Sequence, residues 1–435
     1  MAYYTRYEKL QKYYKDGTAV EPAEYKKGAN LGVAEYSSIE ECQNSSTPPT
    51  PPEPPTPPEP VNYTCCITWE SYDENINFSF NNNDITTNEN PWCTQEKVSS
   101  LDFHKSQSLH IESLDITVDE TNSITSMYLS FGQMGYLRSV KLNMPKAASL
   151  SDISKMFEDS TNLTSINFIN FDTNHVTTAD SAFRNCSKLT SLDVSNWNTG
   201  NLQSANWMFD GCSSLVSLDV SNWNTGNLQD AAFMFENCRS LVSLDVSNWN
   251  TGNLQDAAEM FGRCTSLTSL DVSNWNTSNL RRAAQIFVGC NSLTSLDVSN
   301  WNTSNLQDAS DMFHSCNSLA SLDVSNWDVS NVKYLKYAFG FCRSLTSLDL
   351  SNWNTSKCQD FEFIFYGCEN LETLNLKNFD MSKATSYDGM FGGCNKLNHI
   401  TCKQAFKDWC IAYQDVIQLP AAMRNGGTGT WTIVN

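Results

Sequence analysis

The sequence predicts an α/β solenoid, a right-handed superhelix with a parallel sheet on one face and short helices on the other. The strongest observation is the nonapeptide SLDVSNWNT, which occurs five times and begins every 26 residues from Ser191 onward. Cysteines keep this spacing from Cys186 to Cys394, and phenylalanines keep it from Phe157 to Phe391. A fixed period of this length indicates a solenoid, because each unit buries its apolar face only by stacking on its neighbours.

The strand of each turn comes first in the repeat. Segments in register with LTSLDV at Leu189 begin at Ile111 and end with the one at Leu397, which predicts about twelve turns over residues 111–402. Within a turn, Leu189, Leu192 and Val194 alternate with polar residues, as is typical of a strand with one buried face. We therefore expect the strands of all turns to form one parallel sheet.

A corner and a helix are predicted for the rest of the turn. The segment NWNTGN is rich in residues that favour turns. Apolar residues then follow at helical spacing from Leu202 to Cys212, with Asn201 as the expected N-cap and Gly211 near the end. Each turn should therefore contain a strand, a corner and a short helix.

These motifs resemble a known repeat family. LTSLDVSNW is similar to the L-x-x-L-x-L-x-x-N segment of leucine-rich repeats, and the repeated MF-x-x-C resembles BspA-like bacterial surface proteins. The resemblance covers roughly residues 111–402 and implies a leucine-rich-repeat-like superhelix with an adhesive role. Tryptophan stands where that family usually has asparagine, which predicts an inward aromatic stack, with a sugar-binding row as the alternative. The position is held by Trp197, Trp223, Trp249, Trp275, Trp301, Trp327 and Trp353.

The remaining segments lack the repeat. Residues 1–46 are a small tyrosine-rich segment, which we interpret as an anchor, and the proline-rich residues 47–61 predict a polyproline II linker. A ligand for a PxxP-binding domain is the alternative for this proline stretch. Residues 62–110 are expected to form a β-rich cap, and residues 403–435 a second cap that ends in a strand within GGTGTWTIV.

Composition excludes several function classes. The formal net charge of −20 over 435 residues argues against nucleic acid as a partner, because phosphate binding needs clustered Lys and Arg. Membrane insertion is not expected, since the sequence lacks an apolar run of spanning length, and the N-terminus lacks the apolar core of a secretory signal. Catalytic and nucleotide-binding motifs are also missing from the sequence, so we expect no enzyme activity.

The cysteines are expected to be structural. Nine of the sixteen keep the 26-residue spacing, which favours buried free thiols, with oxidation of stacked neighbours in pairs as the alternative. The sequence has no pair of cysteines, or of cysteine and histidine, at metal-ligand spacing, so no metal site is expected. The pairing of Cys65, Cys66 and Cys93 stays open.

A column of aspartates on the polar side of the strand is the first candidate binding surface. We expect either a solvated sheet face or a groove for cations, sugars or a basic peptide. Neighbouring carboxylates should repel, which predicts raised pKa values and relief by calcium, although no cofactor is otherwise expected. The column consists of Asp193, Asp219, Asp245, Asp271, Asp297, Asp323 and Asp349.

One position of the predicted helix is the second candidate surface, because it varies from turn to turn while the strand does not. Its aromatic members could provide specific contacts, and buried packing could equally explain them. The position carries Trp207, Phe233, Glu259, Gln285, Asp311, Tyr337 and Phe363.

The functional prediction is a non-enzymatic phage fibre or receptor-binding protein. The segments RYEK, EPAEYKKG and EYSSIEEC resemble the start of tail and fibre proteins from phages of gut Bacteroidales, crAss-like phages among them. That resemblance implies attachment to other virion proteins through residues 1–46 and contact of the solenoid with a glycan or protein on the host cell. A homo-oligomer is compatible with this role, and a BspA-like adhesin on a bacterial surface is the alternative. The candidate anchoring residues are Tyr4, Arg6, Tyr7, Tyr25 and Tyr36.

Overall fold

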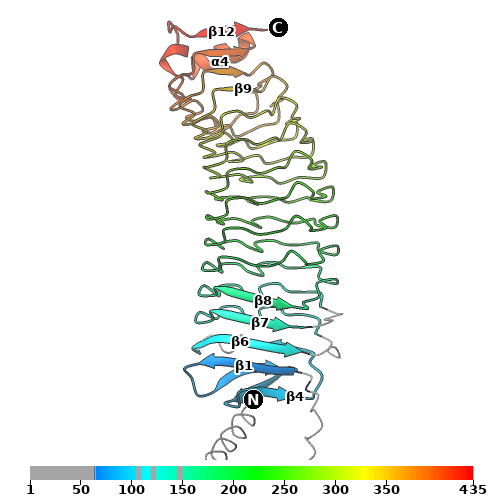
Figure 1. The fold of residues 1–435 in the computed structure, drawn as a ribbon. Helices are drawn as coiled ribbons and strands as arrows, with labels where there is room; N and C mark the ends of the chain where they lie inside the picture. The colour runs from blue at the N-terminus through cyan, green and yellow to red at the C-terminus, as the bar shows by residue number, and fades with distance from the viewer. Residues whose placement is uncertain (1–62, 64, 104–108, 119–123, 145–149, 435) are drawn as a thin grey trace, which may run out of the picture. The chain divides into compact units, whose positions relative to one another are not determined.

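The structure is a computed structural model that describes residues 63, 65–103, 109–118, 124–144 and 150–434. The predicted anchor, residues 1–46, and the predicted linker, residues 47–61, lie outside the described residues. Residues 62–435 form one compact unit. Its turns stack in one column, from the blue strands β1 and β4 to the red strand β12 (Figure 1).

Two small antiparallel arrangements precede the repeats. Strand β1 (Cys65–Ser71) pairs with β4 (Trp92–Thr94) on one side and with β6 (Ile111–Val118) on the other. Strand β2 (Ile76–Phe80) pairs with β3 (Asn83–Thr87) and β5 (Leu101–Asp102) in a second sheet. A disulfide between Cys66 and Cys93 joins β1 to β4, which answers the question that the sequence left open.

The repeats form the predicted parallel stack. Strand β6 pairs in parallel with β7 (Ser139–Asn143), and β7 pairs with β8 (Ser165–Ile169). Single parallel bridges continue the register through the middle turns, as between Ser217 and Ser243. The sheet resumes with β9 (Ser347–Asp349), β10 (Thr373–Asn375), β11 (His399–Cys402) and β12 (Thr430–Ile433). Twelve strand positions from Ile111 to Leu397 enclose eleven intervals of 26 residues, so the predicted solenoid is confirmed.

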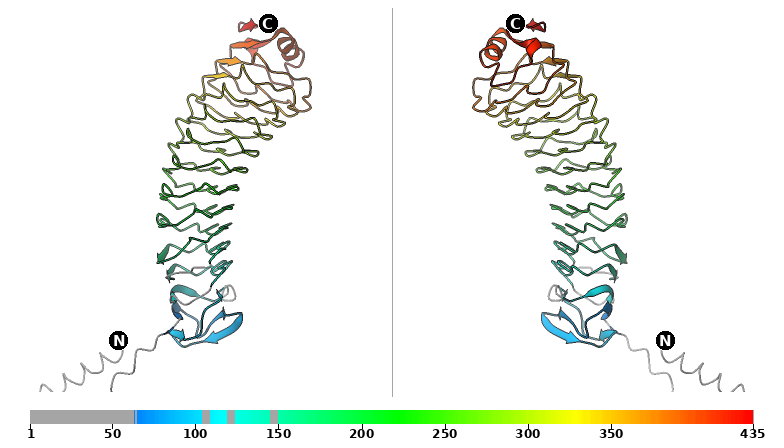
Figure 2. Two further views of the ribbon diagram at one scale, coloured as in Figure 1. Left: turned by 90° about the vertical axis from the view of Figure 1, so that its right-hand side faces the viewer. Right: turned by 90° about the vertical axis from the view of Figure 1, so that its left-hand side faces the viewer.

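The short helix predicted in each turn is wrong. Within the described ranges, the helices are α4 (Gln404–Ala412) and the 3-10 helix η3 (Ala421–Met423), both after the last repeat (Figure 2). Trp207 has a left-handed φ of 52°, which interrupts any helical run. Its N–H donates to Ala232 O of the next turn at 3.0 Å, instead of to a carbonyl four residues back. Asn201 caps no helix, since its Nδ2 donates to Asn174 O at 2.7 Å.

Two aromatic columns fill the interior. Phe209 and Phe235 stack with ring centroids 5.5 Å apart, and Trp249 and Trp275 stack at 6.4 Å and 2°. Each tryptophan from Trp223 to Trp353 donates its indole N–H to a valine carbonyl one turn back, as Trp275 Nε1 does to Val246 O at 3.2 Å. The column is 1–8% exposed, so the inward stack is confirmed and the sugar-binding row is excluded.

The cysteine column is buried and reduced, as expected. Cys212 Sγ donates to Phe183 O at 3.1 Å, and the other column members repeat this contact. Burial raises the pKa of these thiols, to about 12 for Cys290. Because the thiolate is the reactive form, the column is chemically inert at neutral pH.

Candidate functional site

The aspartate column lies on the exposed side of the parallel sheet, where the sequence placed it. Each member accepts a hydrogen bond from the backbone of the serine two residues later, and most also accept one from its hydroxyl. Asp271 Oδ1 accepts from Ser273 N at 3.1 Å and from Ser273 Oγ at 2.7 Å. The same pair of bonds recurs at Asp193, Asp219, Asp245, Asp297 and Asp323.

The predicted rise of the aspartate pKa values is wrong. Hydrogen bonds from Ser273 lower the pKa of Asp271 from its usual 3.8, and this effect outweighs the repulsion from Asp297. The pKa values of Asp219 and Asp297 are lowered for the same reason. The serine hydrogen bonds stabilise the ionised carboxylates. The repulsion between neighbouring aspartates that calcium was expected to relieve therefore does not raise these pKa values. Among the described residues, no group of three His, Cys, Asp or Glu side chains could hold a metal ion.

The variable position, predicted on a helix, instead forms a column of residues with left-handed backbone conformation. All seven members have φ between 50° and 62° and are partly exposed. Trp207 stacks on Phe233 with ring centroids 4.9 Å apart, and Tyr337 stacks on Phe363 at 4.7 Å. Rings stacked along the column cover one another's faces, so packing between turns accounts for much of their burial.

A cluster of carboxylates around Arg263 includes Glu259 of this column and was not predicted from the sequence. Arg263 Nη1 contacts Glu236 Oε1 and reaches Glu259 Oε2 at 3.3 Å. Asn237 Nδ2 donates to Glu236 Oε1 at 3.1 Å and to Asp210 Oδ1 at 3.3 Å. Burial, followed by the charges of Glu259 and Asp210, raises the pKa of Glu236 to about 7. This carboxyl group therefore titrates near neutrality.

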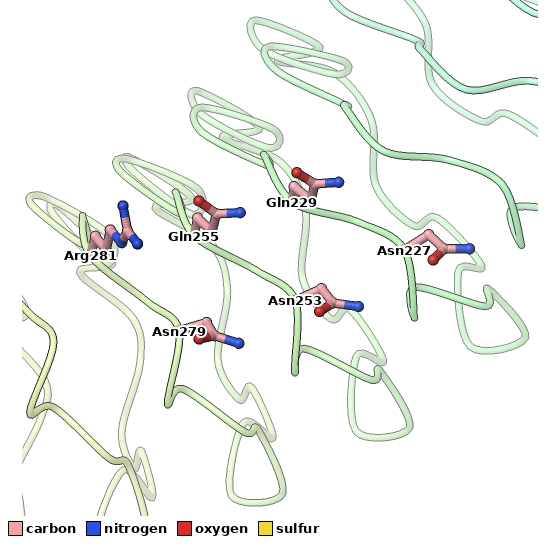
Figure 3. Close-up of a pocket in the computed structure, with 6 residues that line it drawn as sticks. All are labelled: Asn227, Gln229, Asn253, Gln255, Asn279 and Arg281. Carbon is pink, nitrogen blue, oxygen red and sulfur yellow. The ribbon is translucent and has the colours of Figure 1, made fainter.

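Polar side chains also line a shallow hollow of about 370 Å³ on the flank of the solenoid. Figure 3 shows two columns there, with one asparagine and one glutamine or arginine from each of three turns. Asn253 Nδ2 donates to Gly226 O at 2.7 Å, so this asparagine column holds the turns together. The exposed side chains of Gln229, Gln255 and Arg281 leave hydrogen-bonding groups to solvent, once per turn. We call these two columns the amide face. The tripeptide NLQ, which recurs in register with the 26-residue repeat, marks it in the sequence.

The candidate anchoring residues all belong to the N-terminal segment, residues 1–46. Tyr4, Arg6, Tyr7, Tyr25 and Tyr36 all lie outside the described residues. Within the part of the chain that the structure describes, no helix has the length and apolar character needed to cross a membrane.

The fold and its repeated surfaces define the class of the protein, a parallel β-solenoid of the leucine-rich-repeat kind. A family profile described as "Mycoplasma protein of unknown function, DUF285" matches residues 125–244, 206–321 and 284–404. These ranges span well over half of the chain, so the chain belongs to this family. The match supports the BspA-like resemblance, whereas the resemblance of residues 1–46 to phage tail proteins has no support among the comparisons.

Similarity to individual proteins is remote. No curated protein matches the chain. A structure of the Drosophila Toll–Spatzle complex is 17% identical, with 67% of this chain and 41% of that chain covered and a TM-score of 0.24. The structure of the TLR13–ssRNA13 complex is 14% identical, with 65% of each chain covered and a TM-score of 0.16. The chain thus spans less than two thirds of either protein, and TM-scores this low carry no argument about its function.

Proposed function

We propose that this protein is a non-enzymatic adhesion protein whose solenoid binds a glycan or protein on a cell surface. One observation carries the proposal: the amide face presents one asparagine and one glutamine or arginine side chain per turn, over a core that holds each turn in register. A regular array of this kind can bind several repeats of one extended ligand at once, so weak contacts combine into useful affinity.

A binding role is favoured over catalysis by the chemistry of the exposed groups. The sheet-face carboxylates repeat from turn to turn, and serine hydrogen bonds keep them ionised instead of poising one of them as a proton donor. The column thiols are buried and protonated. The net charge of −20 disfavours nucleic acid as the ligand.

Paired surface variants test which face binds. In one variant Gln229, Gln255 and Gln307 are replaced by alanine; Gln307 is exposed and continues the glutamine column one turn after Arg281. In the other variant Asp219, Asp245 and Asp297 are replaced by asparagine. We expect adhesion of purified protein to target cells to fall about tenfold for the glutamine variant, from several lost hydrogen bonds, and to stay unchanged for the aspartate variant. Failure of the unaltered protein to adhere to any candidate host would refute the adhesion proposal.

For the biological setting, we propose a virion fibre anchored through residues 1–46, with a bacterial surface adhesin as the alternative. Support for the virion comes from the N-terminal sequence alone. Antibodies against the solenoid should label phage particles in electron micrographs, whereas labelling of intact cells would identify a surface adhesin.

Residues 62–435 should fold and compete with particle adsorption, and deletion of residues 1–46 should abolish incorporation into the particle but not cell binding.

A further inference from the structure

An open pocket of about 690 Å³ lies where α4 follows the last repeats. Helix α4, which contributes Phe406 and Trp409 to the lining, lies at the C-terminal end of the stack (Figure 2). The volume falls within the range of about 300–1,000 Å³ that is typical of small-molecule sites. Since α4 belongs to no repeat, this pocket does not recur along the solenoid as the repeated surfaces do.

Two local departures from the repeat create the pocket. The tryptophan column continues at Phe379, whose smaller ring packs edge-on against Phe406 with centroids 5.9 Å apart. Phe406 and Trp409 lie three residues apart, and therefore on one face of α4, and their rings stack at 5.9 Å with an angle of 28°. Together with Met381, these rings give the pocket an apolar aromatic wall.

The rest of the lining is polar and has hydrogen-bonding groups without a partner among the described residues. Asp380 Oδ1 accepts from Ser382 N at 2.8 Å, whereas its Oδ2 has no hydrogen-bond partner within the described ranges. Asn354 Oδ1 accepts from Ser356 N at 3.2 Å, and its Nδ2 likewise lacks a partner there. Lys403 forms no ion pair with any described residue. The pocket therefore offers a carboxylate acceptor, an amide donor and an ammonium donor.

We propose that this pocket binds a neutral pyranose unit of a saccharide. A pyranose ring has an apolar C–H face that fits the partly exposed side chains of Trp409 and Met381, while Phe406 is only 4% exposed and supports Trp409 from behind. Its hydroxyls both donate and accept, as the polar lining requires. Asp380 and Lys403 have opposite formal charges, so the pocket carries no net charge and favours a neutral ligand. The inference rests on the proposed adhesion function for its setting, since the ligand would be a terminal sugar of a surface glycan.

The test uses the full chain and isothermal titration calorimetry. The probes are neutral trisaccharides of glucose, galactose, mannose and N-acetylglucosamine. We expect at least one to bind with a Kd in the millimolar range or tighter. Trp409→Leu and Asp380→Ala should each weaken binding about tenfold, through lost ring packing and a lost charged hydrogen bond.

Asp328→Ala is the matched control for Asp380→Ala. Asp328 occupies the same repeat position two turns earlier, where its Oδ1 accepts from Ser330 N at 2.9 Å and its carbonyl accepts from Thr303 Oγ1 at 3.0 Å. Asp380 makes the equivalent bonds, so both variants lose the same local contact. The control should bind saccharide as the unaltered chain does.

Three results would overturn the inference: no trisaccharide binds, the Trp409 and Asp380 variants bind with unchanged affinity, or unglycosylated peptides bind in place of sugars. If Trp409→Leu fails to fold, the Asp380 and Asp328 pair decides alone. Saccharide binding by a chain that adheres to no cell would refute the proposed function and leave the pocket assignment intact. Cell adhesion that survives in the Asp380 variant would refute a role for the pocket and leave the proposed function standing.

Discussion

Glu236→Gln is expected to stabilise the protein above neutral pH. The Glu236 side chain is only 11% exposed, and the negative charges of Glu259 and Asp210 oppose its ionisation. Arg263 partly compensates but is itself 45% exposed. Ionised Glu236 therefore costs folding free energy, and a neutral amide of the same shape removes that cost.

The sign and size of the effect follow from the raised pKa. A folded-state pKa of about 7, against 4.5 for the ordinary group, means that the native state binds the proton more tightly than the unfolded chain. Stability should therefore increase as the pH falls from above 7 towards 4.5. The full shift corresponds to about 3 kcal/mol, and solvent screening at the Arg263 side reduces this to about 1–2 kcal/mol.

The assay is urea unfolding between pH 5 and 8.5, followed by tryptophan fluorescence. Wild-type stability should rise by about 1–2 kcal/mol on acidification over this range, and the Gln variant should show a flatter profile. Glu158→Gln is the control, because Glu158 holds the same repeat position three turns earlier and pairs with Arg184 at 3.5 Å. The control should lose stability and keep the wild-type pH slope. A Glu236→Gln variant with the wild-type slope, or with lower stability at pH 8, would refute the reasoning.

Three further predictions concern the repeat itself. Ser273→Ala should move the pKa of Asp271 up towards 3.8, as followed by carbon NMR, and an unchanged value would show that the hydroxyl does not hold the carboxylate. Trp275→Ala should lower the free energy of unfolding by about 3–5 kcal/mol through a buried cavity, and a loss below about 1 kcal/mol would mean that the stack is not core. Gly389→Ala should destabilise by about 1–3 kcal/mol, because φ is +60° and the new Cβ would lie 2.4 Å from Phe363 Cε1; an unchanged melting temperature would contradict this close approach.

The 26-residue period was sufficient to predict a stacked solenoid and the residues that share each column, although not the backbone conformation of the whole turn. Residues that recur at a fixed interval occupy one column when turns stack, so the sequence alone placed the tryptophans, phenylalanines and cysteines inside. It also placed the aspartates outside, because alternation along a strand assigns each side chain to a face. Both candidate surfaces that it predicted exist as columns.

Tertiary structure decided how the other half of each turn folds. Apolar spacing from Leu202 to Cys212 fits a helix, yet the same side chains are buried by a left-handed turn that hydrogen-bonds to the next turn. Helical periodicity predicts which side chains face the core. It does not predict the carbonyl to which each backbone N–H donates its hydrogen bond. The acceptor carbonyls belong to the adjacent turn of the solenoid. The spacing of apolar residues within one turn gives no information about them.

Electrostatics and the unique pocket were likewise outside the reach of the repeat pattern. The pKa of Asp271 depends on how Ser273 is oriented, and that of Glu236 on side chains from neighbouring turns. The pocket depends on α4, which is not part of any repeat. Helix α4 packs against Phe379, which occupies the tryptophan position of its turn. The sequence by itself determined which residues share a column. Contacts between different columns, and between repeats and cap, depend on distances that only the folded chain defines.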